Sequence, residues 1–192
     1  KISKWNQVNL DFPDVGIKLC GPGMDSGTLD VFNKAVNGSK TNSRTDYTSS
    51  EDDNVLVRCV MENKDALAYS VYAYFKNNFK SLKSVEIINP EGQAISPSKQ
   101  TVQNEKYQPL ARPLFLYVND QSLRRNKNFL QFVSYYLRNI SSLVNSSNYI
   151  PLPDSTYRLV DAKLYRHILG TSFGGDLPVG LTIGQAIDRS FD

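Results

Sequence analysis

The sequence has 192 residues, of which 40% are hydrophobic and 21% are charged, and its 22 basic and 19 acidic residues leave a formal net charge of +3 at pH 7. It contains no run of about 18 apolar residues, so none of its segments is a candidate membrane-spanning helix. The charge is too balanced, and the basic residues are too scattered, for a nucleic-acid-binding protein.

Two cysteines, Cys20 and Cys59, limit the covalent cross-links and metal sites that the chain can form. They are too few for a disulfide framework, and they lack zinc-ligand spacing. Two interpretations are open: one disulfide bridge, which would suit an oxidising compartment, or two buried free thiols, because cysteine packs well as a small hydrophobic residue. With His167 as the single histidine, we expect neither a metal site nor a cofactor.

The first part of the chain predicts a strand followed by a helix. Residues 17–20 are rich in apolar side chains and lead into a Gly-Pro-Gly turn at 21–23, which indicates a buried strand. Ser26 is a good N-cap and Gly38 a good C-terminal cap, and the apolar residues between them have helical spacing. We therefore expect a helix between Ser26 and Gly38.

A second helix is predicted to start at Ser50, because the three carboxylates after it would face the positive end of the helix dipole. Strands are expected over 66–71 and 84–88, and an aromatic-rich helix over 72–79 between them. We interpret the aromatic residues here as core packing, since few basic residues lie among them and stacking with nucleic acid would require more.

The polar stretch 89–108 carries Pro and Gly without periodicity, which predicts a long loop or a crossing between two lobes. After it, the apolar run 114–118 predicts a strand, and 126–144 predicts a long amphipathic helix with Phe132 among its inward side chains. A final helix is expected over 154–169. This alternation of strands and helices predicts an α/β fold with a mainly parallel sheet, divided into two lobes.

The loop between the first strand and the first helix has the composition of an anion-binding loop. Backbone N–H groups at a helix start have no internal partner, and Gly27 lets the main chain approach a ligand closely. Ser26 and Thr28 add hydroxyl donors. The alternative is that Ser26 is only an N-cap and Gly23 only a turn residue. A nucleotide is disfavoured because the loop lacks the Gly-Lys-Ser/Thr ending of a P-loop.

The run Gly-Pro-Gly-Met-Asp-Ser-Gly-Thr at 21–28, with the residues that follow it to Phe32, resembles the phosphate loop of the phosphate-binding proteins of bacterial phosphate ABC transporters. Further matches to this family follow in the same order along nearly the whole chain. They lie at residues 4–5, 43–47, 50–54, 66–69, 72–74, 108–115, 149–153 and 180–183. Several ordered motifs with compatible spacing are far more specific than one loop.

The resemblance implies a type II periplasmic-binding-protein-like fold of two lobes with mainly parallel sheets. It also implies that the amino-terminal part of the first lobe is lacking, and that this part is cleaved, disordered or supplied by another chain. Residues 1–106 would form the second lobe with the phosphate loop, and residues 107–192 would return into the first lobe and form a tail. The affinity of this chain alone for phosphate should then be poor.

The resemblance also implies which side chains contact phosphate. They are Asp25, Ser26, Gly27, Thr28 and Arg44. Arg44 would pair with two phosphate oxygens in one plane, or it forms a surface ion pair with Asp46. Asp25 either accepts a hydrogen bond from a protonated phosphate oxygen or orients Arg44. Six residues depart from those usual in the family: Met24, Cys20, Cys59, Ala68, Ser70 and Val71. Each departure is compatible with neutral drift, and together they would crowd positions near the cleft.

The implied function is the binding of inorganic phosphate in the periplasm, or elsewhere outside the cytoplasm, for delivery to an ABC permease. No chemistry is done on the ligand. An alternative from another class is a relict binding fold that serves as a structural subunit of a larger membrane-associated assembly; exposed apolar surface near Phe115 and Tyr117 would favour it. An enzyme is not expected, since His167 is interpreted as a surface or capping residue and no Gly-x-Ser-x-Gly elbow is present.

Overall fold

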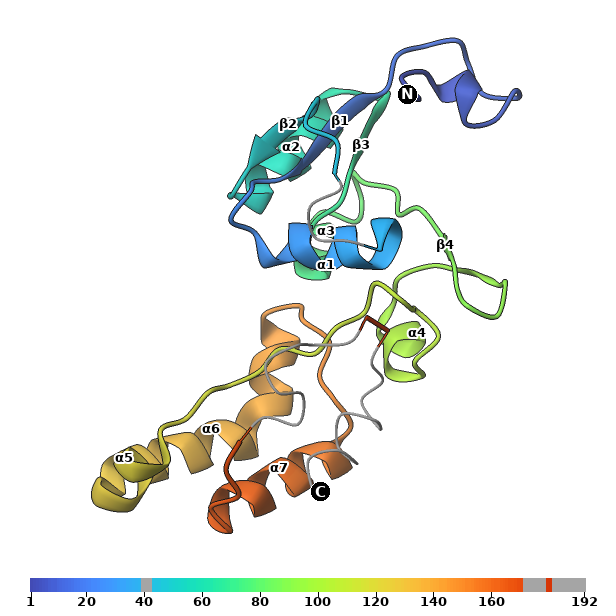
Figure 1. Cartoon of the computed structure of the whole chain (residues 1–192). Coiled ribbons are helices and arrows are strands. Elements are labelled where there is room, and N and C mark those ends of the chain that lie inside the picture. Colours follow the sequence, from blue (N-terminus) through green and yellow to red (C-terminus); the bar gives the residue numbers. More distant parts are fainter. Residues whose placement is uncertain (39–42, 171–178, 181–192) are drawn as a thin grey trace. The chain divides into compact units, whose positions relative to one another are not determined.

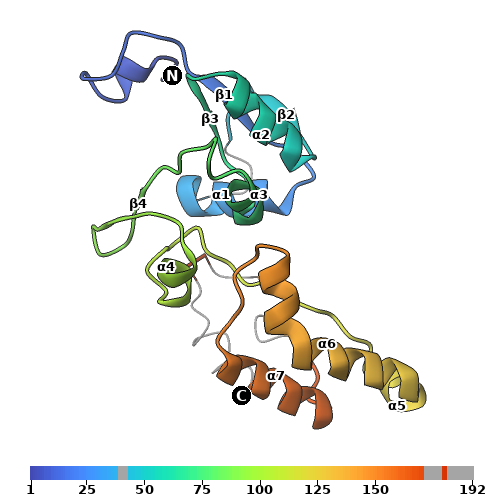
Figure 2. The ribbon, with the colours of Figure 1, turned by 180° about the vertical axis from the view of Figure 1, so that it is seen from behind.

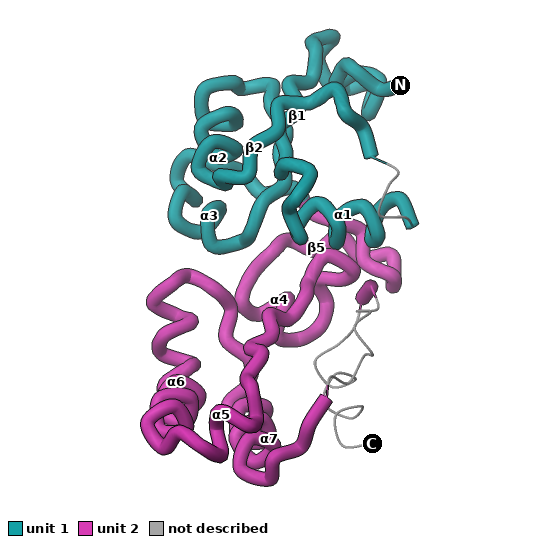
Figure 3. Tube along the Cα trace, turned by 60° about the vertical axis from the view of Figure 1, so that its left-hand side comes forward, with its two compact units in different colours: residues 1–85 teal, residues 86–192 magenta. Residues whose placement is uncertain are grey.

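The computed structural model describes residues 1–38, 43–170 and 179–180, and the chain divides into two compact units, Lys1–Val85 and Glu86–Asp192 (Figures 1 and 3). Each unit has its own helices and strands. The lobe boundary that the sequence places after residue 106 stays a prediction, because compact units of this chain need not coincide with the lobes of a longer protein.

Unit 1 is built on a three-stranded parallel sheet in the order β2-β1-β3. Cys20 in the central strand pairs with Thr48 of β2 and with Ala68 of β3. Helix α2 packs against all three strands, and α1 packs against β1. The elements are η1 (Trp5–Gln7), β1 (Lys18–Pro22), α1 (Gly27–Asn37), β2 (Thr48–Ser50), α2 (Asp53–Glu62), β3 (Ala66–Ala68) and α3 (Tyr72–Asn77).

The ends of α1 are set by the two caps that the sequence predicts. The Ser26 hydroxyl accepts a hydrogen bond from the N–H of Thr28 at 3.2 Å, and Gly38 ends the helix with φ of 69°. Helix α2 starts later than predicted, because Ser50 is the last residue of β2 and Asp52 is the cap, accepting from the N–H of Asn54 at 2.9 Å. Local side-chain chemistry therefore determines where both helices begin.

A disulfide joins Cys20 of β1 to Cys59 of α2, with 6.6 Å between their Cα atoms. The sequence leaves open one disulfide or two free thiols, and the structure shows the disulfide. Cys20 is buried, as are Leu56 and Val57 on α2 and Leu29 on α1. The bridge thus ties the central strand to the helix that covers it, close to the residues where the strand turns toward α1.

Unit 2 contains a short antiparallel hairpin and four helices among its described residues. A cluster of Leu123, Val133 and Leu137, with partly buried neighbours that include Val118 and Leu164, forms the core beneath α5, α6 and α7. The elements are β4 (Ile87–Ile88), β5 (Ala94–Ile95), α4 (Lys99–Gln103), α5 (Asp120–Arg125), α6 (Lys127–Ser146) and α7 (Asp154–Tyr165).

The stretch 89–108 is more ordered than a long loop, so that prediction was wrong in part. The side chain of Asn89 accepts hydrogen bonds from the N–H of Glu91 at 3.1 Å and of Gln93 at 2.8 Å, which supports the turn between β4 and β5. A capping box between Ser98 and Thr101 then starts α4. Side-chain to backbone bonds order this stretch, and apolar periodicity does not reveal them.

Two further predictions for unit 2 were wrong. Residues 114–118 form no strand in the described part of the chain, because a strand needs a hydrogen-bonded neighbour and none lies beside them. On α6, Val133 and Leu137 point inward as expected, but Phe132 is exposed. Both departures leave apolar side chains of unit 2 open to solvent.

Candidate anion-binding site

The candidate site is the turn that carries the chain from β1 into α1. It leaves the sheet at the carboxyl end of the parallel strands, where Pro22 of β1 lies beside Ser50 of β2. The N–H of Gly23 donates to the carbonyl of Ser50 at 3.1 Å, and the N–H of Ser26 donates to the carbonyl of Gly23 at 3.2 Å. Ligands of open α/β sheets bind at this end of the strands, so the loop is placed where an anion site is expected.

Aromatic side chains pack against the end of β1, just before this turn. The Tyr47 hydroxyl donates to the carbonyl of Pro22 at 3.0 Å, and the rings of Phe32 and Tyr69 stack with their centroids 4.0 Å apart. A Cβ on Gly21 would lie 3.2 Å from the rings of both Tyr47 and Tyr69. Burial raises the pKa of Tyr69 to about 12. Tyr69 is half-buried and packs against Phe32, as predicted for this aromatic series, whereas Phe79 in the same series is exposed.

Four of the five predicted phosphate ligands lie together in this turn. Ser26 is an N-cap, as the simpler interpretation held, but its oxygen accepts from Thr28, and a serine hydroxyl that accepts one bond can still donate another. The Asp25 side chain is exposed, and its carboxylate makes no hydrogen bond or ion pair with any described residue. Gly27 is the first residue of α1, where the helix dipole favours negative charge.

The fifth predicted ligand, Arg44, is engaged elsewhere in unit 1. Its Nε and Nη2 atoms donate to the two carboxylate oxygens of Asp46, each at 2.9 Å, and its Nη1 donates to the carbonyl of Ile2 at 2.5 Å. Asp46 also pairs with Lys1 at 3.1 Å. The Arg44 and Lys1 hydrogen bonds hold the pKa of Asp46 well below its usual range. Within the described residues, Arg44 makes no hydrogen bond to the loop. Of the two alternatives for Arg44, a phosphate contact or an ion pair with Asp46, the structure therefore shows the ion pair.

Glu51 has a role at the loop that was not predicted from the sequence. Glu51 follows the last residue of β2 and lies outside α2, and its Oε1 accepts from the N–H of Asp25 at 3.2 Å. A Cβ on Gly23 would lie 2.0 Å from the same oxygen, so only glycine leaves room for this carboxylate. The signal in the sequence was Gly23 of the Gly-Pro-Gly turn, because glycine is used where another group approaches the backbone closely as well as in turns.

Three of the residues that depart from the family pattern lie at or near this turn. Met24 is exposed to solvent, and Cys20 and Cys59 are held in their bridge. That these departures together crowd the site stays a prediction.

The other chemistry-bearing residues of the described chain do not suggest catalysis. His167 belongs to unit 2, where its Nδ1 lies 2.5 Å from Oδ1 of Asp120, next to Arg124, whose Nε donates to Asp120 at 2.7 Å. This pairing agrees with the structural interpretation of His167. Within residues 1–38, 43–170 and 179–180, no group of three His, Cys, Asp or Glu side chains could hold a metal ion. The helices found there are also too short or too polar to cross a membrane.

Residues 1–139 match the sequence model of the PBP superfamily domain. Over 188 residues the chain is 40% identical to Protein SphX of Synechocystis sp., covering 98% of this chain and 56% of that protein. Over 167 residues it is 32% identical to Phosphate-binding protein PstS of Staphylococcus aureus, covering 86% of this chain and 50% of that protein. The chain thus spans about half the length of these relatives.

A solved structure is also similar: the crystal structure of a possible phosphate binding protein from Planctomyces limnophilus. It superposes with a TM-score of 0.72 at 36% sequence identity, over 88% of this chain and 60% of that chain. The predicted PBP-like α/β fold with a parallel sheet is therefore confirmed.

Proposed function

Because this chain belongs to the PBP superfamily, we propose that it contributes to the capture of inorganic phosphate, which the loop at residues 25–28 holds without chemical change. The observation that carries this proposal is the placement of Asp25, Ser26, Gly27 and Thr28 together at the start of α1, at the carboxyl end of the parallel strands. Two relatives are named as phosphate-binding proteins, one of them as a possible one. No enzymatic step is proposed, in agreement with a family of binding proteins.

The loop supplies groups that suit a tetrahedral oxyanion. The positive end of α1, an 11-residue helix, favours negative charge, and the hydroxyls of Ser26 and Thr28 are donors at the same place. The exposed carboxylate of Asp25 is an acceptor. Inorganic phosphate keeps at least one proton near neutral pH and can donate to Asp25, whereas sulfate has no proton to donate. The loop should therefore prefer phosphate to sulfate.

Arg44 joins the site by exchanging its partner. An exposed ion pair contributes little to stability, so the bond between Arg44 and Asp46 opens easily. A phosphate ion offers the guanidinium the same pair of oxygens with more charge. Arg44 thus serves as an anion ligand in the loaded state and as the partner of Asp46 in the free state, which unites the two interpretations of the sequence.

Delivery of phosphate to an ABC permease, outside the cytoplasm, is the second part of the proposal. The disulfide between Cys20 and Cys59 supports it, since such bridges persist in oxidising compartments. The similarity to PstS of Staphylococcus aureus supports it as well. The partners would be phosphate and a permease, with polypeptide equivalent to the unmatched half of the relatives completing the binding protein.

The structural-subunit alternative receives no particular support. It predicts exposed apolar surface near Phe115 and Tyr117, and both side chains are exposed. A domain that matches about half of its relatives would expose the same surface without any change of role. Capture of phosphate therefore remains the function that the site favours.

Calorimetric titration of the chain with phosphate tests the proposal, with sulfate as the competing anion. We expect weak, saturable heat with phosphate and little with sulfate. Thr28→Val should weaken phosphate binding about 10-fold or more, because a hydrogen bond to a charged group contributes about 1.5–3 kcal/mol. Thr45→Val, at an exposed threonine outside the loop, is the matched control. Absence of heat, both for the chain alone and after addition of the unmatched half of Synechocystis SphX, would remove the capture function.

A further inference from the structure

The chain that leaves α3 carries a local excess of positive charge in unit 1. Residues 66–85 contain three lysines, Lys76, Lys80 and Lys83, and no aspartate or glutamate. All three side chains are exposed, and none of them forms an ion pair with a residue that the structure describes. The described part of unit 1 therefore leaves their charge uncompensated.

Large apolar side chains lie among and after these lysines. Phe79 is 55% exposed, and Val85 is 63% exposed. The ammonium group of Lys76 lies over the Phe79 ring, 5.4 Å from its centroid, which is a cation–π contact. Exposed cations and exposed apolar groups thus occur together on one short stretch, which we call the 76–85 surface.

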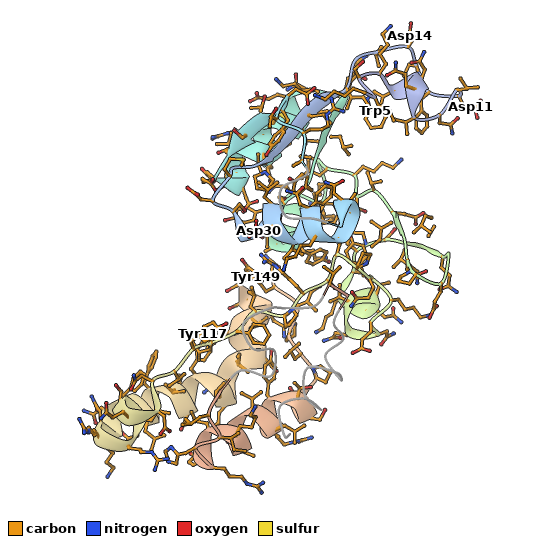
Figure 4. All side chains as sticks on the ribbon, viewed as in Figure 1. Trp5, Asp11, Asp14, Asp30, Tyr117 and Tyr149 are labelled. Carbon is orange, nitrogen blue, oxygen red and sulfur yellow. A yellow bond between two sulfur atoms is a disulfide. The ribbon has the colours of Figure 1, made fainter. Side chains whose placement is uncertain are left out.

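The acidic residues closest to this surface in the sequence or labelled in the figures have other positions or partners. Figure 4 labels Asp11 and Asp14 on the amino-terminal segment and Asp30 on α1. The first acidic residue after the surface is Glu86, whose carboxylate accepts a hydrogen bond from the Ser96 hydroxyl at 2.9 Å. The surface is therefore basic without an acidic residue on its own stretch.

The first part of the surface is held in place by α3, which packs against α2. The N–H groups of Ser81 and Leu82 donate to the carbonyl of Asn78 at 2.9 and 3.1 Å. The side-chain amide of Asn78 donates in turn to the carbonyl of Tyr74 on α3, also at 2.9 Å. Figures 1 and 2 show the chain continuing from there as an irregular run that leads to β4. The turn at residues 78–82 is thus fixed to α3.

We propose that the 76–85 surface binds reversibly to a bilayer that carries anionic lipid headgroups. The lysines pair with lipid phosphates at the interface, and Phe79 enters the boundary between headgroups and acyl chains. Binding is weak, because three lysines and one aromatic ring contribute far less than a membrane-spanning helix. Contact with lipid is a separate claim from phosphate capture and from delivery to a permease, and it depends on neither.

The composition of the surface favours lipid over a macromolecular partner. Lysine is depleted in protein–protein interfaces, where arginine is enriched, and residues 66–85 contain no arginine. Tight binding of a nucleic acid takes about 6–10 phosphate contacts, which is more than three lysines supply. A flexible ammonium group acts as a point charge without a fixed partner geometry, so it suits headgroups that move laterally in a membrane.

Co-sedimentation of the chain with lipid vesicles tests the proposal. We expect the chain to bind vesicles of equal parts phosphatidylglycerol and phosphatidylcholine and to be released as salt is added. It should not bind vesicles of phosphatidylcholine alone. Lys80→Gln/Lys83→Gln should lower the partition coefficient about 20-fold, since one lysine near an anionic surface corresponds to about 5-fold.

Lys18→Gln/Lys64→Gln is the matched control and should change the partition coefficient little. It removes the same charge from two exposed lysines of unit 1 that lie outside the surface. Lys18 pairs with Ala66, the first residue of β3, and Lys64 precedes that residue. The control therefore lies at the amino end of β3, whereas α3 and the surface follow its carboxyl end.

A second measurement reports on the position of the aromatic ring. Phe79→Trp introduces a fluorophore at the surface, and Trp5 is the only tryptophan of the natural sequence. Brominated lipid in phosphatidylglycerol vesicles should quench the variant more strongly than the wild type, because the added ring reaches the acyl-chain boundary. Equal quenching of the two proteins would contradict insertion of this residue.

Four results of the sedimentation experiment would overturn the proposal. They are no binding to phosphatidylglycerol vesicles, equal binding to phosphatidylcholine, equal losses in the two double variants, and equally strong binding to polyglutamate, which would indicate an acidic protein as partner. Circular dichroism checks that each variant is folded, and Lys83→Gln, with an expected loss of about 5-fold, replaces a double variant that is not. Lys80→Gln/Lys83→Gln should bind phosphate as the wild type does, so capture and lipid binding can fail separately.

Discussion

The carboxylate of Glu51 accepts a hydrogen bond from the backbone N–H of Asp25, 3.2 Å away, although 26 positions separate the two residues in the sequence. Glu51 thereby links the end of β2 to the turn that enters α1. The same oxygen occupies the space beside Gly23. The shape of the candidate anion loop therefore depends on a carboxylate that directly follows another strand, as well as on its own residues.

Gly23→Ala should push Glu51 away and release the bond to Asp25. The expected loss is about 1 kcal/mol of the free energy of unfolding, a typical value for one hydrogen bond. A double-mutant cycle with Glu51→Ala, followed by urea unfolding, checks the cause. Once Glu51 is absent, Gly23→Ala should have little further effect. Additive losses would show that Gly23 matters for some other reason.

The disulfide between Cys20 and Cys59 should stabilise unit 1 strongly. For the observed separation of 39 residues, the loss of chain entropy in the unfolded state corresponds to about 4 kcal/mol of the free energy of unfolding. A reductant should therefore lower the free energy of unfolding of the wild type, measured in urea, by an amount of this order. The double variant Cys20→Ala/Cys59→Ala should be less stable from the start and insensitive to reductant. An unchanged wild-type curve would contradict the role of the bridge.

Asp46 should compete with phosphate for Arg44. Asp46→Asn leaves the guanidinium without its carboxylate, so the affinity for phosphate should rise several-fold, while Arg44→Gln should lower it. Calorimetric titration gives both values. Asp14→Asn is a suitable control, because Asp14 forms a comparable exposed pair with Lys4 at 2.9 Å in the same unit. If Arg44→Gln and the wild type bind phosphate equally, Arg44 is an ion-pair residue only.

Low pH should destabilise unit 2 because Asp120 becomes protonated. The hydrogen bond from Arg124, and then that from His167, lowers the pKa of Asp120 in the folded protein below the ordinary value of an aspartate. As the pH falls, Asp120 is therefore protonated in the unfolded chain before it is protonated in the folded protein. The stabilisation that its ionised carboxylate provides above about pH 4 is lost as the pH falls through the lowered pKa. Thermal unfolding of Asp120→Asn should depend less on pH below about 4 than that of the wild type. An identical pH dependence would argue against this pairing in solution; Asp11→Asn, in the other unit, controls for general charge effects.

Features that depend on neighbouring residues in the sequence could be predicted from it. Ser26 and Gly38 cap α1 as expected, because a cap needs only its own helix end. The grouping of Asp25, Ser26, Gly27 and Thr28 followed from their position between a strand and a helix. The parallel sheet followed from the alternation of apolar runs and helical patterns.

Features that depend on distant parts of the chain could not be predicted. Glu51 looked like a helix-start carboxylate, and only the pairing of β2 with β1 brings it to Asp25. The apolar run 114–118 predicted a strand, but a strand exists only beside a partner, and the described residues supply none. The sequence also left two states open for Cys20 and Cys59, because it does not give the distance between β1 and α2.

The most direct test of the central claim is a ¹H–¹⁵N NMR titration of the labelled chain with inorganic phosphate. The amide signals of Ser26, Gly27 and Thr28, and the side-chain Nε signal of Arg44, should shift together and saturate at one phosphate per chain. An equal concentration of sulfate should move them less. If these signals stay in place while phosphate shifts others, or shifts none, the loop at the start of α1 is not the phosphate site.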